Sequence, residues 1–260
     1  MSAFSSRLRE GLLILHSIMY LAYSQIYRRY CGSLLGLGWS LMSPMIMIAV
    51  YYLAFRIFFR VPIENFAVYL AAGLMPWLFV VNSVIASAKT LTNHRDVLEN
   101  YTISPLLFLF STVMAEWLFF LMSYVVAIIF AAISDLTNWT TLLLPVYLMP
   151  LFIFTAASGV IIGYASVHFR DIPHLLGVFF ALAFWFVPIV YHWSFIPEGY
   201  VDIIRYNPLS ILITPSQVIL HGNALPSLKV FLAGIYLSLI WVAFALYIHR
   251  RFRKRIVYYL

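Results

Sequence analysis

Long apolar runs alternate with short charged segments along the whole chain. A helix needs about 20 consecutive apolar residues to cross the hydrocarbon core of a bilayer. Six runs meet or approach that length: residues 34–59, 68–88, 106–133, 142–167, 175–191 and 230–248. The pattern therefore predicts an all-α membrane protein with six transmembrane helices, of which the fifth is the shortest. An even number of spans places both termini on the same side.

The chain before the first run has a different pattern. Apolar residues recur there at intervals of three, four or seven: Leu8, Leu12, Leu15, Met19 and Ile26. This spacing puts them on one face of a helix, as in helices that lie in the membrane interface. We therefore expect residues 1–32 to form an amphipathic interfacial helix. A short span is the alternative, but it would carry Arg28 and Arg29 to the outer side.

A second irregular region lies between the fifth and sixth runs. Residues 203–220 are largely apolar, but Asn207-Pro208 and Pro215 interrupt them. The segment is too broken to cross a bilayer and too apolar for an ordinary loop. Broken backbone at membrane depth is tolerated only where protein or a water-filled cavity satisfies its polar groups. We therefore expect a re-entrant outer helical hairpin here, at the mouth of a channel.

Composition and charge agree with this topology. Of the 260 residues, 64% are hydrophobic and 10% are charged, whereas soluble domains carry about a quarter charged residues. With both termini cytoplasmic, only four of the 16 Lys and Arg residues lie outside: Arg56, Arg60, Arg205 and Lys229. Positive charge marks the cytoplasmic face of membrane proteins. The net charge of +7 therefore indicates orientation and not a nucleic-acid partner.

Several chemistries are not indicated by the sequence. Lys89, Lys229 and Lys254 do not follow glycine, so the chain lacks the phosphate loop of an ATPase. The seven histidines are scattered without metal-ligand spacing. Ser158 and His249 only partly match intramembrane serine proteases, and a small-residue patch is more typical of close helix packing. We expect no enzymatic activity, no metal site and no cofactor in this chain.

Glu116 is the clear carboxylate within a predicted span. Ion-coupled transporters place ionisable groups in mid-membrane, so a secondary transporter that uses Glu116 is one alternative. A hydrogen bond between helices is the simpler role for a single acid, and we favour it.

The inner connection between the second and third spans, residues 93–101, is short and polar. Asn93 can cap a helix, and Asp96 would then lie in its first turn, where a carboxylate suits the helix dipole. The pattern favours a short cytoplasmic helix suited to docking a partner, with a plain loop as the alternative.

Three motifs follow one another at a characteristic spacing. The first is residues 28–44, Arg-Arg-Tyr-Cys-Gly-Ser-Leu-Leu-Gly-Leu-Gly-Trp-Ser-Leu-Met-Ser-Pro, and the second is Gly-Leu-Met-Pro-Trp at 73–77. The third combines Phe-Arg-Asp-Ile at 169–172, Pro-Ile-Val-Tyr at 188–191 and Asn-Pro-Leu at 207–209. Together they resemble the membrane permease subunit of bacterial ABC exporters for cell-surface polysaccharides, meaning the O-antigen of lipopolysaccharide, capsule and teichoic acid.

The resemblance implies one ABC exporter transmembrane domain over residues 1–260. It would comprise the interfacial helix (1–32), a six-helix bundle (33–250) and a cytoplasmic tail (251–260). The chain would form a homodimer in the bacterial inner membrane, with both termini cytoplasmic and two separate ATPase subunits that bind ATP and Mg²⁺. The cargo would be a lipid-linked polysaccharide. A permease for drugs or small lipids is the alternative.

Three sets of candidate site residues follow from the resemblance and from residue type. Coupling to the ATPase is expected of Arg28, Arg29, Asn93, His94, Arg95, Asp96, Glu99 and Tyr101. The outer gate is expected at Pro188, Pro197, Asn207, Pro208 and Pro215. An aromatic belt along the channel is expected from Tyr51, Tyr52, Phe55, Trp185, Tyr191 and Trp193. Sugar C–H faces pack on aromatic rings, although such residues also gather at membrane boundaries without touching a substrate.

Overall fold

The computed structural model describes residues 2–101, 103–253 and 256, and it contains helices and no strand over these residues. The α-helices are α1 (Ser2–Tyr30), α2 (Gly38–Tyr52), α3 (Phe66–Asn93), α4 (Arg95–Asn100), α5 (Pro105–Ile133), α6 (Leu144–His168), α7 (Ile172–Ala183), α8 (Val201–Arg205), α9 (Pro208–Leu220) and α10 (Leu228–Phe252). A π-helical turn, η1 (Leu53–Phe58), continues α2, and a 3-10 turn, η3 (Phe184–Phe186), continues α7.

Five helical units of the described chain are long and apolar enough to cross a membrane. They are Gly38–Phe58, Phe66–Asn93, Pro105–Ile133, Trp139–His168 and Leu228–Phe252. These units confirm the all-α membrane class and coincide with five of the six predicted runs. The remaining predicted run is helical only over Ile172–Phe186, which is a shorter apolar helix, as is α9. The count of six spans stays a prediction.

Two predicted boundaries are displaced, each for a local backbone reason. The helix that contains α7 ends at Phe186 instead of Tyr191, and Val187 is extended with φ −122° and ψ 130°. Pro188 causes this break, because proline lacks an N–H and disfavours helical backbone in the residue before it. At the other end of the bundle, Gly36 has φ +50°, which delays the start of α2 to Gly38.

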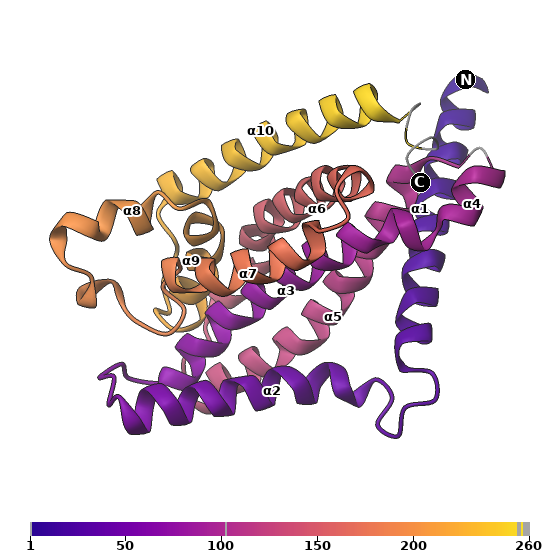
Figure 1. The fold of residues 1–260 in the computed structure, drawn as a ribbon. Coiled ribbons are helices and arrows are strands. Elements are labelled where there is room, and N and C mark those ends of the chain that lie inside the picture. The colour runs from indigo at the N-terminus through magenta and orange to yellow at the C-terminus, as the bar shows by residue number, and fades with distance from the viewer. Residues whose placement is uncertain (1, 102, 254–255, 257–260) are drawn as a thin grey trace.

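The central element of the bundle is α3. It packs against α2, α5, α6, α7 and α9, and most of its side chains from Phe66 to Leu91 are buried. By contrast, α2 buries only Ser40 and Ile48. Figure 1 shows α2 and α10 along opposite edges of the bundle, with α3, α5 and α6 between them. The core therefore forms around α3, and Gly38–Phe58, which contains α2, is the least buried of the five membrane-length units.

The N-terminal helix crosses the end of the bundle. Figure 1 shows α1 running transverse to α2 and α3, at the end where α4 lies and opposite to α8. Three of its apolar side chains, Leu12, Leu15 and Met19, are exposed. This orientation suits a helix in the membrane interface. At the other terminus, α10 continues through Phe252, and most of the predicted tail at 251–260 lies outside the described residues.

Small residues bring α3 and α6 close together. A Cβ atom at Gly159 would lie 2.7 Å from the Ser87 hydroxyl oxygen and 3.0 Å from Cγ2 of Val113. The hydroxyls of Ser83 and Ser87 are buried on the facing side of α3. Contacts of this kind let two helix backbones approach within a membrane, as the small-residue patch on α6 predicts.

We expect Gly159→Val to destabilise the bundle by about 1–3 kcal/mol, because the new methyl groups overpack the contact with Ser87 and Val113. The measurement is the apparent melting temperature of the purified protein. Gly177→Val is the matched control, since nothing lies within 4 Å of a Cβ at Gly177 and the change in helix propensity is the same. Equal losses from both variants would contradict the prediction.

Candidate functional site

The chain leaves helical structure within the bundle, directly after η3. Val187, Ile189 and Val190 are each at most 1% exposed. The Tyr69 hydroxyl of α3 lies 2.8 Å from the carbonyl oxygen of Pro188 and 2.7 Å from that of Tyr191, and it donates to one or the other. Side chains thus satisfy backbone groups that a helix would satisfy internally.

A second donor to this segment comes from α9. Nε2 of Gln217 donates to the carbonyl oxygen of Pro188 at 2.9 Å. A Cβ atom at Gly73 would lie 2.6 Å from that Nε2 and 3.5 Å from Cα of Ile189. Glycine at position 73, the first residue of the second motif, therefore lets the extended segment and α9 pack together on α3.

Helix α9 lies against the first half of α3 and runs in the opposite direction. Near its end, Nε2 of His221 donates to the carbonyl oxygen of Glu64 at 2.8 Å. Near its start, Leu209 lines a cavity with Val80 and Val84, farther along α3. Helix α9 is thus held beside α3, and its N-terminal end lies nearer the middle of the bundle than its C-terminal end.

The predicted gate residues occupy different parts of this arrangement. The side-chain oxygen of Asn207 accepts the N–H of Leu209 at 3.0 Å and caps α9, and its amide donates to the carbonyl oxygen of Phe186 at 2.9 Å. Pro208 begins α9, and Pro215 is buried within it. Pro197 is exposed, just before the 3-10 turn η5 (Glu198–Tyr200). The structure thus brings Asn207 to Phe186, two residues before Pro188, while the gating role of these residues stays a prediction.

Three members of the predicted aromatic belt come together through Phe184. Tyr51 stacks on Phe184 with ring centroids 5.4 Å apart, and Phe184 meets Trp185 edge-on at 5.6 Å. Phe55 lies 6.3 Å from Tyr51 and 6.4 Å from Trp185. The result is a continuous aromatic surface from α2 and η1 to η3, with Trp185 exposed.

The other belt members lie apart from that surface. Tyr52 contacts Phe66 at 6.1 Å, at the start of α3. The Tyr191 hydroxyl donates to the carbonyl oxygen of Trp185 at 2.8 Å and ties the extended segment to η3. Trp193 begins the 3-10 turn η4 (Trp193–Phe195) and is partly buried. Contact of any belt residue with sugar stays a prediction.

The predicted coupling segment forms a short helix, α4, as the sequence favours, but Asn93 does not cap it. Helix α3 continues through Asn93 because the N–H of His94 still bonds to the carbonyl oxygen of Thr90 at 3.2 Å. His94 is the junction residue, and its Nδ1 donates to the same oxygen at 2.8 Å. Asp96 lies in the first turn of α4, where a carboxylate is favourable.

The polar side of α4 faces away from the bundle. Leu98 is buried against it, whereas Arg95, Asp96, Glu99 and Tyr101 are exposed. Nε of Arg95 bonds to Oε1 of Glu99 at 2.7 Å. Figure 1 places α4 at the same end of the bundle as α1. The helix thus offers an exposed polar surface, and its contact with an ATPase stays a prediction.

Polar side chains of α1 join it to the bundle, which sequence reasoning missed. Arg29 forms an ion pair with Glu116 of α5, and its guanidinium lies 5.1 Å from the ring centre of Phe119. Nε2 of Gln25 donates to Oγ of Ser111 at 3.1 Å. Oγ1 of Thr112 donates to Oε1 of Gln25 at 3.2 Å. Arg28 is exposed as well, and the role of both arginines in coupling stays a prediction.

Comparison with known proteins places the chain in a family. No family model matches it. It is 28% identical over 247 residues to the O-antigen export system permease protein RfbA of Myxococcus xanthus, covering 93% of each chain. A protein of the same name from Klebsiella pneumoniae is 30% identical over 188 residues, covering 71% of this chain and 72% of its own. A second from that organism is 28% identical over 197 residues, covering 75% and 76%.

The chain belongs to the O-antigen export permease family. Ser158 and His249, the two residues that partly match serine proteases, bond to different partners. Oγ of Ser158 donates to the carbonyl oxygen of Phe154 and accepts the indole N–H of Trp241, at 2.9 Å each. His249 pairs instead with the hydroxyl of Tyr164 at 2.7 Å. Glu116 is held by Arg29, as expected for a carboxylate that joins two helices.

We expect Tyr69→Phe to destabilise this permease by about 1–3 kcal/mol, because the extended segment loses one of its side-chain donors, at the carbonyl oxygen of Pro188 or of Tyr191. Thermal unfolding of the purified protein measures the loss. Tyr236→Phe provides the control, since Tyr236 is exposed on α10. An unchanged melting temperature for Tyr69→Phe would show that the extended segment does not depend on Tyr69.

The ion pair predicts a specific pattern of rescue. Arg29→Gln leaves the buried Glu116 carboxylate without its cation and should cost about 1–3 kcal/mol, less than a fully buried pair because Arg29 is 45% exposed. Glu116→Gln in the same chain removes the stranded charge and should restore most of the stability. The four melting temperatures of this double-mutant cycle measure the coupling. Additive losses would mean that the two side chains do not act as a pair.

Proposed function

We propose that this permease is the membrane-spanning subunit of an ATP-driven ABC exporter that moves a lipid-linked cell-surface polysaccharide of O-antigen or capsule type across the bacterial cytoplasmic membrane. The observation that carries the proposal is the similarity to O-antigen export permeases over up to 93% of the chain. The buried, side-chain-supported break after η3 supports it, because irregular backbone at membrane depth occurs where it is enclosed by protein or lines a cavity.

The working unit that we propose has two copies of this chain and two cytoplasmic ATPase subunits. The ATPase subunits bind ATP and Mg²⁺, and this chain binds neither. A second copy suits α2, because this apolar helix buries few of its side chains within one subunit. The excess of Lys and Arg in the segments on the side of α4 supports placing that end, and both termini, in the cytoplasm.

In the proposed mechanism, α3 connects the ATPase side with the outer side. Its last residue, Asn93, is followed by His94 and α4, which would receive the motion of the ATPase. Its first turns carry Tyr69 and Gly73, which hold the extended segment and α9. Because α3 is one continuous helix, displacement at α4 would reach this outer region directly. The extended segment, with Asn207 and α9, would then act as the gate.

The aromatic surface from Tyr51 to Trp185 would line the polysaccharide path in this proposal. Rings offer weak, repeated contacts to the C–H faces of sugars. A conduit needs contacts favourable enough to admit its cargo but weak enough to release it.

Export in cells and recovery of the ATPase subunit with the purified permease test the proposal. Asp96→Arg reverses a charge on the exposed side of α4 and should lower both, by at least tenfold for export. Asp202→Arg is the control, because Asp202 is also exposed but lies on α8 at the opposite end. Normal export and normal recovery with Asp96→Arg would refute the role of α4.

The same assay separates the exporter from an ion-coupled transporter. Loss of the partner ATPase should abolish export, whereas Glu116→Gln should retain most of it, because an amide can still bond to Arg29. Export that survives loss of the ATPase but stops with Glu116→Gln would instead establish ion coupling.

A further inference from the structure

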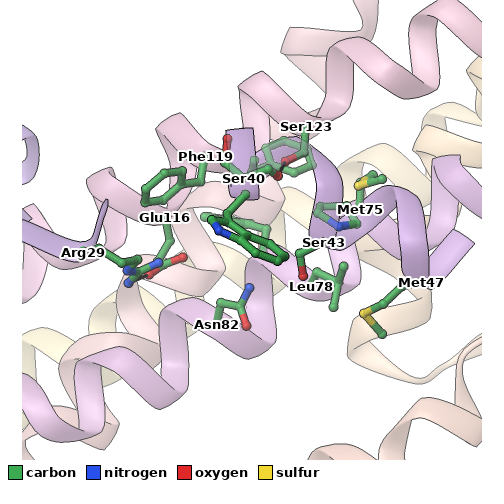
Figure 2. A pocket seen from close by; sticks show the side chains of 14 residues that line it. Arg29, Ser40, Ser43, Met47, Met75, Leu78, Asn82, Glu116, Phe119 and Ser123 are labelled. Atoms are coloured by element: carbon green, nitrogen blue, oxygen red, sulfur yellow. Dashed lines mark hydrogen bonds and ion pairs between the residues drawn. The ribbon is translucent and has the colours of Figure 1, made fainter. Parts of the chain in front are cut away.

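A cavity of about 200 Å³ lies between the end of α1 and helices α2, α3 and α5. Figure 2 shows Arg29 and Glu116 pointing toward each other on one side of it, with Asn82 of α3 close by. The opposite side is formed by Met47 and Leu78. The cavity therefore has one polar end and one apolar end.

The polar end offers mainly hydrogen-bond donors. The Arg29 side chain is 45% exposed and that of Glu116 only 3%, so a ligand would meet the guanidinium and not the carboxylate. Asn82 and Ser43 are exposed and line the same cavity. Glu116 and the ring of Phe119 fix the guanidinium in place. Guanidinium and amide groups arranged in this way suit the oxygens of a phosphate ester.

The apolar end lies deeper in the bundle. Met75 lines the cavity seven residues before Asn82 on α3, about two turns farther from the α4 end. With 28 residues, α3 spans roughly 42 Å and exceeds the hydrocarbon core of about 30 Å. At least one end of α3 therefore extends beyond the core. Trp39 and Ser43, in the first two turns of α2, also line the cavity, so its polar end lies toward the α1 end of the bundle.

We propose that this cavity binds one phospholipid of the inner leaflet, with its phosphodiester at Arg29 and Asn82 and an acyl chain along Met47 and Leu78. The polar residues that line the cavity lie nearer the α4 end of the bundle than the apolar ones. This is the order in which the head group and the acyl chains of an inner-leaflet lipid would lie. Because Glu116 balances the charge of Arg29, the site suits a singly charged phosphodiester held by hydrogen bonds rather than a multiply charged anion. The cavity of about 200 Å³ would hold the phosphodiester and the first part of one acyl chain, and the rest of the lipid would extend along the uncovered side of α2.

The inference is independent of the polysaccharide cargo, and a binding measurement on the purified full-length protein tests it. The probes are phosphatidylglycerol, a diacylglycerol with the same two chains, and glycerol 3-phosphate. Native mass spectrometry under conditions that remove loosely bound lipid should retain one phosphatidylglycerol per subunit. The diacylglycerol lacks the phosphate and glycerol 3-phosphate lacks the chains, so neither should be retained.

Two variants locate the site. Arg29→Gln combined with Glu116→Gln removes the guanidinium without stranding a buried charge, and Asn82→Leu removes the amide from an exposed position. Each should lower phosphatidylglycerol occupancy at least tenfold. Arg205→Gln removes a cation at the α8 end and should leave it unchanged. Equal retention of the diacylglycerol, binding of glycerol 3-phosphate alone, or full occupancy in both variants would overturn the proposal.

Discussion

A bilayer interior offers no hydrogen bonds to the backbone, and this constraint governs the region after α7. Pro188 ends the helix within the bundle and exposes carbonyl oxygens that no helical N–H can reach. Tyr69 and Gln217 supply donors to that segment, and Asn207 supplies one to Phe186. The need to pair these carbonyl oxygens thus fixes the positions of α3, α9 and the extended segment relative to one another. Gly73 provides the close approach that these bonds need.

A related requirement, that polar and charged side chains be paired where they are buried, explains how α1 is joined to the bundle. The exposed apolar residues of α1 do not by themselves fix its orientation relative to the neighbouring helices. The bonds from Gln25 and Arg29 to α5 supply that orientation. Because Glu116 is buried and ionic, moving α1 away would leave its charge in an apolar surrounding. The N-terminal helix and the bundle core are therefore expected to move as one unit.

Sequence reasoning located the long helices because their apolar length is a property of each segment alone. It placed the end of the fifth helix at Tyr191 instead of Phe186, because the apolar run continues past Pro188, which ends the helix through the residue before it. It did not find Tyr69 or Gln217 as donors, since these are 119 and 29 residues from Pro188. It did not find the partners of Gln25 on α5. The polar residues Ser111, Thr112 and Glu116 within one apolar run were the available signal for that contact.

The continuity of α3 has a consequence for how this protein can change over evolution. One helix carries the contacts to the extended segment in its first turns, those to α6 through Ser87, and the junction with α4 at its end. Inserting one residue near its middle would rotate one half against the other by about 100°. No loop interrupts the helix to absorb that rotation. The spacing between these three sets of contacts is therefore expected to tolerate substitution far better than any change in length.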